Sequence, residues 1–103
     1  MDVKVGALSD FPPATTKAVT AGDYDIVLIR NSAGVVTALI DKCSHADVRL
    51  SEGTLEGDEI ECAAHGARFD TKTGKALCMP AIAPVRAFEV KISGDDILVV
   101  VPE

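Results

Sequence analysis

Short runs in which apolar residues alternate with a period of two occupy both ends of this chain. The runs are Val3/Val5/Ala7, Ile26/Leu28, Val35/Thr37/Leu39 with Val36/Ala38/Ile40 on the opposite face, and Phe88/Val90/Ile92. This alternation is typical of half-buried antiparallel strands, and no window sustains the apolar stripe of an amphipathic helix. Turn signals at residues 31–34 (Asn-Ser-Ala-Gly) and 93–96 (Ser-Gly-Asp-Asp) predict two hairpins in which glycine supplies a positive φ. The pattern therefore predicts an all-β fold.

The size and charge of the chain limit what it can be. Its 103 residues suit a single domain spanning residues 1–103, which would bury roughly two thirds of its unfolded surface. The longest purely apolar run, at residues 97–101, is far short of the roughly twenty residues that span a bilayer, so we expect no membrane association. A formal net charge of -6 leaves no basic stripe for phosphates, so we expect no nucleic-acid partner. The first residues show neither a signal-peptide nor a twin-arginine pattern, and we expect a cytoplasmic protein.

The middle of the chain, at about residues 41–80, differs from both ends. It is punctuated by glycines and carries two short motifs, Cys43-Ser-His45 and Cys62-Ala-Ala-His65, which contain both histidines of the protein. Thiolate and imidazole are the groups that hold soft or borderline metals such as zinc and iron. The sequence therefore predicts a loop-rich metal-binding insert on a small β scaffold.

Three kinds of site use these residue types. Structural zinc modules usually place like ligands together, as C-x2-4-C and H-x3-5-H, whereas each motif here mixes one Cys with one His. A catalytic Cys-His dyad would leave the second pair without a purpose. The mixed pairs suit a two-iron cluster with chemically different ends, and a zinc-stabilised module stays as an alternative.

The combined motif C-x-H-x16-C-x2-H, together with the segment 50–62 (Leu-Ser-Glu-Gly-Thr-Leu-Glu-Gly-Asp-Glu-Ile-Glu-Cys), resembles Rieske [2Fe-2S] proteins. It is most similar to the small ferredoxin of bacterial Rieske-type oxygenase systems, and the similarity continues through residues 66–76. The resemblance implies the Rieske fold, a small antiparallel β-sandwich base with a loop-rich cluster-binding subdomain. It also implies that Cys43 and Cys62 bind one iron while His45 and His65 bind the other.

Respiratory high-potential Rieske proteins differ from this chain around the cluster. They resemble C-T-H-L-G-C and C-P-C-H-G-S-x-Y, and the corresponding positions here are Val48, Ala64, Ala67 and Phe69. The disulfide between the loops and the two hydroxyl donors are thus missing, which predicts a reduction potential toward the low end of the Rieske range, roughly -150 mV rather than +300 mV. With both histidines on the cluster, none remains for the mononuclear iron of an oxygenase, so we expect no catalytic activity in this chain.

The resemblance implies a monomeric one-electron carrier. Its partners would be an NAD(P)H-dependent flavoprotein ferredoxin reductase and the terminal Rieske oxygenase of an aromatic ring-hydroxylating dioxygenase. A Rieske subunit of another reductase or of a cluster-assembly system is the alternative within the family.

The predicted partner surface is the tip of the insert. It comprises His45, Ala46, Gly66, Ala67, Met79 and Pro80. Acidic residues surround it, and the run Glu52, Glu56, Asp58, Glu59 and Glu61, which has no Lys or Arg within it, is interpreted as a solvated face beside a docking patch. Charge would steer a weak encounter with basic partners.

Further residues of the insert carry secondary predictions. Cys78 is interpreted as a semi-buried thiol rather than a ligand, and Pro80 as part of a loop that covers the cluster. Gly66 either allows a close approach of the backbone to the cluster or serves as a simple turn glycine. Arg68 and Asp70 are expected to pair and brace the second loop, with little energetic weight.

Overall fold

The computed structural model describes residues 1–42, 48–63, 66–77 and 83–102. Strands dominate these residues, as predicted. In chain order the elements are β1 (Asp2–Ala7), η1 (Leu8–Asp10), β2 (Thr15–Ala21), β3 (Tyr24–Arg30), β4 (Val36–Ile40), η2 (Leu50–Glu52), β5 (Thr54–Glu56), β6 (Glu59–Glu61), β7 (Arg68–Asp70), β8 (Ala87–Phe88), β9 (Val90–Ser93) and β10 (Asp96–Val100). The two short helices are 3-10 turns, and no helix within the described residues has the length and apolar character needed to cross a bilayer.

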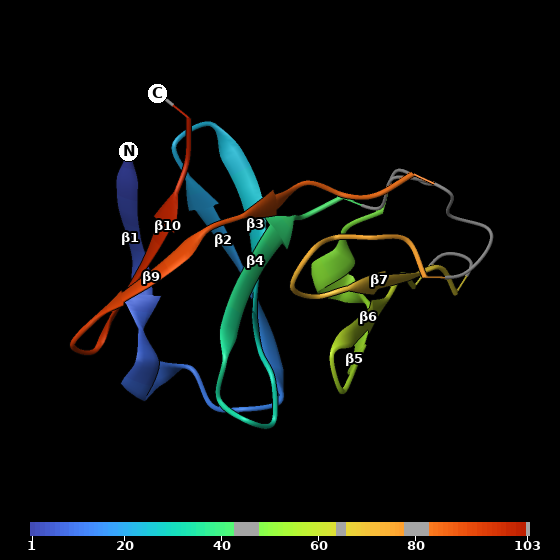
Figure 1. Ribbon diagram of the computed structural model, residues 1–103, viewed down its shortest axis with the longest axis horizontal. Helices are drawn as coiled ribbons and strands as arrows, with labels where there is room; N and C mark the ends of the chain where they lie inside the picture. The colour runs from blue at the N-terminus through green and yellow to red at the C-terminus, as the bar shows by residue number, and fades with distance from the viewer. Residues whose placement is uncertain (43–47, 64–65, 78–82, 103) are drawn as a thin grey trace.

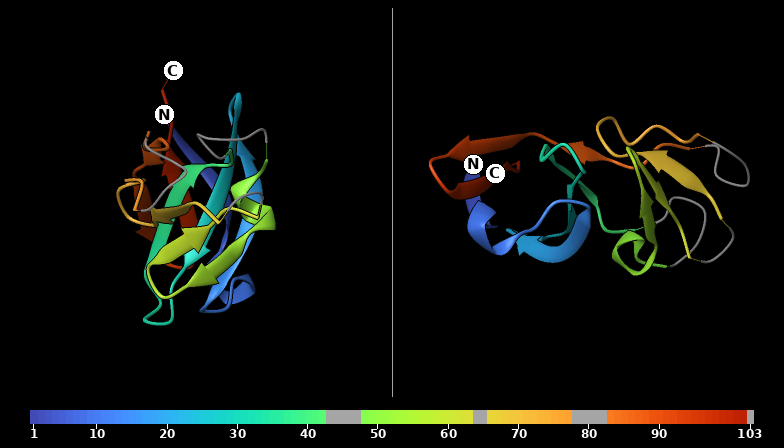
Figure 2. Two further views of the ribbon diagram at one scale, coloured as in Figure 1. Left: turned by 90° about the vertical axis from the view of Figure 1, so that its right-hand side faces the viewer. Right: turned by 90° about the horizontal axis from the view of Figure 1, so that it is seen from below.

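The strands form three antiparallel sheets. The orders are β1-β10-β9, β2-β3-β4-β8 and β5-β6-β7. Figure 1 shows the first two sheets facing each other as the base, with the β5-β6-β7 sheet at one end of the long axis. The molecule extends 38 × 31 × 18 Å, and the view from below in Figure 2 shows base and insert side by side along its length. The all-β prediction and the antiparallel base are confirmed.

Strand β3 is buried on both faces and joins two hydrophobic cores. Ile26 and Leu28 pack in the core between the two base sheets, while Val27 and Ile29 pack in a second core with residues of the insert. Each of these side chains contributes roughly 1.5–3 kcal/mol by leaving water. The sequence analysis expected a half-buried strand here, and this was wrong because the insert covers the face that would otherwise be solvated.

Both predicted hairpins are present. Gly34 has φ 89° between β3 and β4, and Gly94 has φ 62° between β9 and β10. Asn31 closes the first turn with its side chain, whose Oδ1 accepts a hydrogen bond from the Val35 N–H at 2.9 Å. Two apolar residues of the predicted strand runs lie outside the core, because Val35 is 49% exposed and Ile92 in β9 is 47% exposed.

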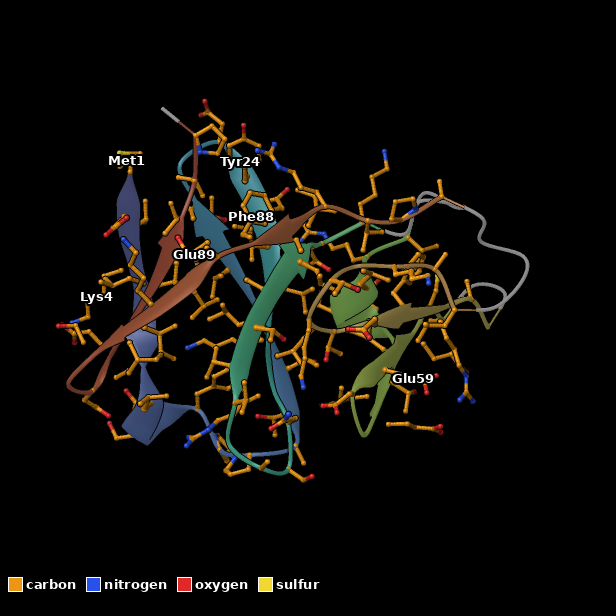
Figure 3. All side chains as sticks on the ribbon, in the orientation of Figure 1. Met1, Lys4, Tyr24, Glu59, Phe88 and Glu89 are labelled. Carbon is orange, nitrogen blue, oxygen red and sulfur yellow. The ribbon has the colours of Figure 1, made fainter. Side chains whose placement is uncertain are left out.

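The insert returns to the base through an aromatic contact. Tyr24 at the start of β3 meets Phe88 of β8 edge to face, with ring centroids 5.5 Å apart, and the two rings are labelled in Figure 3. The Arg86 guanidinium lies over both rings, 5.1 Å from one centroid and 4.9 Å from the other. Such contacts are each worth about 0.5–1.5 kcal/mol and hold the returning chain against β3.

Candidate metal centre

Cys62 lies directly after β6 and is buried in the core that the insert shares with β3. Its N–H donates to the Ala67 carbonyl at 2.6 Å, and its own carbonyl accepts from the Gly66 N–H at 3.2 Å. These bonds extend the β6–β7 hairpin by one pair beyond Glu61 and Arg68. The hairpin therefore fixes the backbone of one predicted thiolate ligand within an apolar environment.

The other three predicted ligands, Cys43, His45 and His65, lie outside the described residues. In the described part of the chain, no group of three or more His, Cys, Asp or Glu side chains is placed to hold a metal ion. The described residues on either side of Cys43 and His45 nevertheless show how that segment is held. Asp41 follows β4, and its buried carboxylate accepts two hydrogen bonds from Ser51, one from the N–H and one from the hydroxyl, both at 2.7 Å. Asp41 and Ser51 thus fix the two ends of residues 41–51, the first motif segment, to each other.

Gly66 adopts a positive φ of 73° in the turn after Cys62. No described atom outside its neighbours lies within 4 Å of where a Cβ would be. The left-handed backbone favours glycine at this position, and a close approach of Gly66 to the cluster stays a prediction.

Gly74 holds the chain after β7 close to Asp70, the last residue of β7, and to Val85. It has φ 77°, and its N–H donates to the Asp70 carbonyl at 2.8 Å. The Val85 N–H donates to the Gly74 carbonyl at 2.9 Å, and a Cβ on residue 74 would overlap the Val85 carbonyl. Only glycine permits this close approach. The predicted roles of Cys78 and Pro80 concern residues outside the described part of the chain.

Arg68 of β7 is paired with carboxylates from the acidic run. Its guanidinium lies 3.0 Å from Glu61, 3.3 Å from Glu56 and 3.7 Å from Glu59. These carboxylates, Glu56 first, raise the pKa of Arg68 above its ordinary value. The predicted pair with Asp70 is wrong: the Asp70 Oδ1 instead accepts from the N–H groups of residues 72 and 73 in the following turn. The antiparallel pairing of β6 and β7 places Arg68 opposite Glu61. The two residues are seven positions apart in the sequence, so their contact was not evident before the strand pairing was known.

The predicted partner surface changes in one residue. Ala67 is fully buried in the insert core and cannot contact a partner. Gly66 is half-buried, while His45, Ala46, Met79 and Pro80 lie outside the described residues. Leu77 is 43% exposed, and its N–H donates to the Arg68 carbonyl at 2.8 Å.

A cleft of about 450 Å³ opens beside the first motif segment. Among the described residues it is lined by Asp23, Tyr24, Asp25, Ile40, Asp41, Lys42, Val48 and Arg49. Cys62 does not line it. The cleft therefore lies beside Asp41, which precedes the Cys43 motif, and not beside the β6–β7 hairpin that carries Cys62.

The two antiparallel base sheets and the third sheet, whose hairpin carries the buried Cys62, form a small all-β domain. The chain belongs to the Rieske [2Fe-2S] domain family, whose model matches residues 1–100. The ferredoxin component of biphenyl 2,3-dioxygenase from Rhodococcus jostii (strain RHA1) is 52% identical over 98 residues, covering 84% of this chain and 92% of the relative.

Solved structures agree with this assignment. The ferredoxin of carbazole 1,9a-dioxygenase from Nocardioides aromaticivorans IC177 superposes with a TM-score of 0.92 at 34% identity, over 96% of each chain. A chain from the complex of reduced oxygenase and oxidized ferredoxin in carbazole 1,9a-dioxygenase superposes with a TM-score of 0.89 at 36% identity, over 95% of this chain and 91% of that one. The cofactor is a Rieske-type [2Fe-2S] cluster, and the comparisons favour it over the zinc-stabilised module.

The described residues suit this cofactor. A buried thiol in an apolar core is a suitable environment for a soft metal, and the whole chain supplies two further thiols and two imidazoles. The two positions predicted to lack hydroxyl donors, Ala67 and Phe69, are fully buried. Val48, at a position predicted to lack a disulfide cysteine, packs against the same core.

Proposed function

We propose that Cys43 and Cys62 hold one iron of the cluster and that His45 and His65 hold the other. The donor types support this assignment, since two thiolates and two imidazoles are the Rieske ligand set. The fixed backbone of Cys62 supports it too, because Cys62 and Ala67 are hydrogen-bonded and residue 65 lies between them in the sequence. Cys43 follows the anchored Asp41 by two residues.

We further propose that the protein is an electron-carrying ferredoxin of an aromatic ring-hydroxylating dioxygenase. It would accept one electron from an NAD(P)H-dependent flavoprotein ferredoxin reductase and deliver it to the terminal Rieske oxygenase. The observation that carries this proposal is the match over nearly the whole chain to dioxygenase ferredoxins, in sequence and in fold. The solved complex of an oxygenase with such a ferredoxin supports the acceptor partner.

In this function the chain supplies binding and environment rather than catalysis. When bound, the cluster accepts and releases one electron. Buried Ala67 and Phe69 exclude water and offer no hydroxyl donor to cluster sulfur, which favours the oxidised state and a low potential. The acidic side chains of the insert, together with the net charge of -6, suit basic partner surfaces. We also propose that the carrier acts as a monomer in the cytoplasm, without a nucleic-acid or membrane partner.

Spectroscopy of the aerobically purified protein tests the ligand set. The protein should be red-brown and, after reduction, show an electron paramagnetic resonance signal with an average g below two. His45→Ala and His65→Ala should each abolish this signal, while Cys78→Ser should leave it intact. A colourless protein that holds one zinc would overturn the proposal.

Reconstitution tests the electron path. Reduced protein should be reoxidised by a ring-hydroxylating terminal oxygenase in the presence of oxygen and its aromatic substrate, with product formed in proportion. The matched control is His65→Ala, which should lack the native cluster and therefore carry no electron to the oxygenase. Rapid reoxidation by other Rieske-dependent systems, without turnover of any aromatic-ring oxygenase, would favour the alternative role in another reductase or in cluster assembly.

A further inference from the structure

Asp41 carries a buried carboxylate at the start of the segment that contains Cys43. The side chain is 0% exposed and accepts two hydrogen bonds from Ser51, whose N–H and hydroxyl both lie at 2.7 Å. The Asp41 N–H also donates to the Asp25 carbonyl at 2.9 Å. Removing a carboxylate from water is costly unless hydrogen bonds or a cation compensate for it. The Ser51 N–H and hydroxyl compensate for part of this cost at Asp41.

Arg49 is a cation beside Asp41 that also contacts a second carboxylate. Arg49 lies 3.7 Å from the Asp41 carboxylate and 3.5 Å from that of Asp25. Its side chain is 54% exposed, so water screens its attraction. Arg49 is thus shared between two carboxylates.

We propose that Asp41 is a positioning residue that also sets the reduction potential of the cluster. The inference rests on the proposed ligand role of Cys43. Asp41 ties the start of the first motif segment to Ser51 at its far end. Two residues of chain span at most ~7 Å, so the buried charge lies close to the Cys43 backbone. A nearby negative charge that is shielded from bulk water opposes the arrival of an electron and therefore lowers the potential.

Three variants separate the charge from the tether. Asp41→Asn removes the charge and nearly keeps the shape, so the midpoint potential should rise. Arg49→Gln leaves both carboxylates without their cation, so the potential should fall below that of the wild type. Ser51→Ala removes one hydrogen bond and keeps the charge, so iron should be lost faster to a chelator while the potential shifts less than in Asp41→Asn.

The matched control is Asp96→Asn. Asp96 is a carboxylate paired with one cation, Lys4, at 3.1 Å. It belongs to β10 in the base, at the opposite end of the molecule from the β5-β6-β7 sheet (Figure 1). Its removal changes the net charge as Asp41→Asn does, and the potential should stay at the wild-type value.

The experiment is a redox titration of each holoprotein at one neutral pH, followed by electron paramagnetic resonance. Shifts of opposite sign for Asp41→Asn and Arg49→Gln, with Asp96→Asn unchanged, are the expected result. Shifts of the same sign, or an Asp41→Asn shift equal to that of Asp96→Asn, would overturn the inference. If Asp41→Asn does not fold, an unchanged potential in Arg49→Gln still overturns it. Absence of a cluster from the wild type would instead refute the proposed function.

Discussion

The backbone of Gly53 lies directly against the carbonyl oxygen of Glu61, the residue that precedes Cys62. A Cβ on residue 53 would overlap this oxygen, and it would also lie 3.2 Å from the Leu50 carbonyl. Gly53 follows η2 and leads into β5, so the contact joins the end of the first motif segment to the hairpin of the second. The two parts of the proposed cluster site are therefore held together by backbone, at a point where a side chain has no room.

Gly53→Ala should destabilise the protein and disturb Cys62. The added methyl group must push the β6 backbone away, which should lower the free energy of unfolding by about 1–3 kcal/mol. Urea denaturation measures the loss of stability, and iron per chain measures the effect on the site. Gly6→Ala is the matched control, because no described atom lies within 4 Å of its Cβ position. Equal stability of the two variants would contradict the crowding argument.

Arg68 neutralises part of the acidic run, and its removal should leave the carboxylates of this run repelling one another. Arg68→Gln leaves Glu56, Glu59 and Glu61 without their shared cation, so we expect a small loss of stability at low salt. The difference should shrink at about 1 M salt, because screening weakens repulsion between exposed carboxylates. Urea unfolding at both salt concentrations measures this. Lys4→Gln, which removes a cation from one carboxylate only, should lose less.

The pH dependence of the Arg68 contribution follows from its pKa. The carboxylates raise this pKa, so the folded protein holds the proton more tightly than the unfolded chain does. The stabilisation is therefore fully present below the ordinary arginine pKa and is lost only above the raised value. Between neutral and mildly alkaline pH, the stability difference between the wild type and Arg68→Gln should stay constant. A stability difference that decreases between neutral and mildly alkaline pH would contradict the raised pKa of Arg68.

Local patterns predicted the fold well, and long-range pairing explains where they failed. The two glycine hairpins followed from turn chemistry, because Gly34 and Gly94 each supply the positive φ. The burial of both faces of β3 did not follow, since it depends on an insert that joins the base only in three dimensions. The ligand motifs were readable because metal chemistry restricts residue types. The contacts of Arg68 and Gly53 could not be predicted from the sequence. The first depends on the register of β6 and β7, and the second on the close approach of two backbone segments.

Asp58 links the insert to the base through a side-chain contact. Its Oδ1 accepts a hydrogen bond from the Asn31 Nδ2 at 2.9 Å, and its carbonyl accepts from the Thr71 N–H at the same distance. Asp58→Ala should cost about 1–3 kcal/mol, because the buried Asn31 amide loses its acceptor. Asp58→Asn keeps an acceptor oxygen and should retain most of the stability. Urea unfolding compares the two, and amide exchange at Thr71 should be faster in the alanine variant only.

Phe69 provides a test of why the potential is predicted to be low. Relatives of high potential carry a tyrosine at this position, whereas Phe69 is fully buried in the core that also holds Cys62. Phe69→Tyr should raise the midpoint potential from roughly -150 mV, because a hydroxyl donor near cluster sulfur stabilises the reduced state. Phe88→Tyr places the same hydroxyl in the other core and should leave the potential unchanged. A redox titration that finds equal potentials in the two variants would show that the missing hydroxyl is not what lowers the potential here.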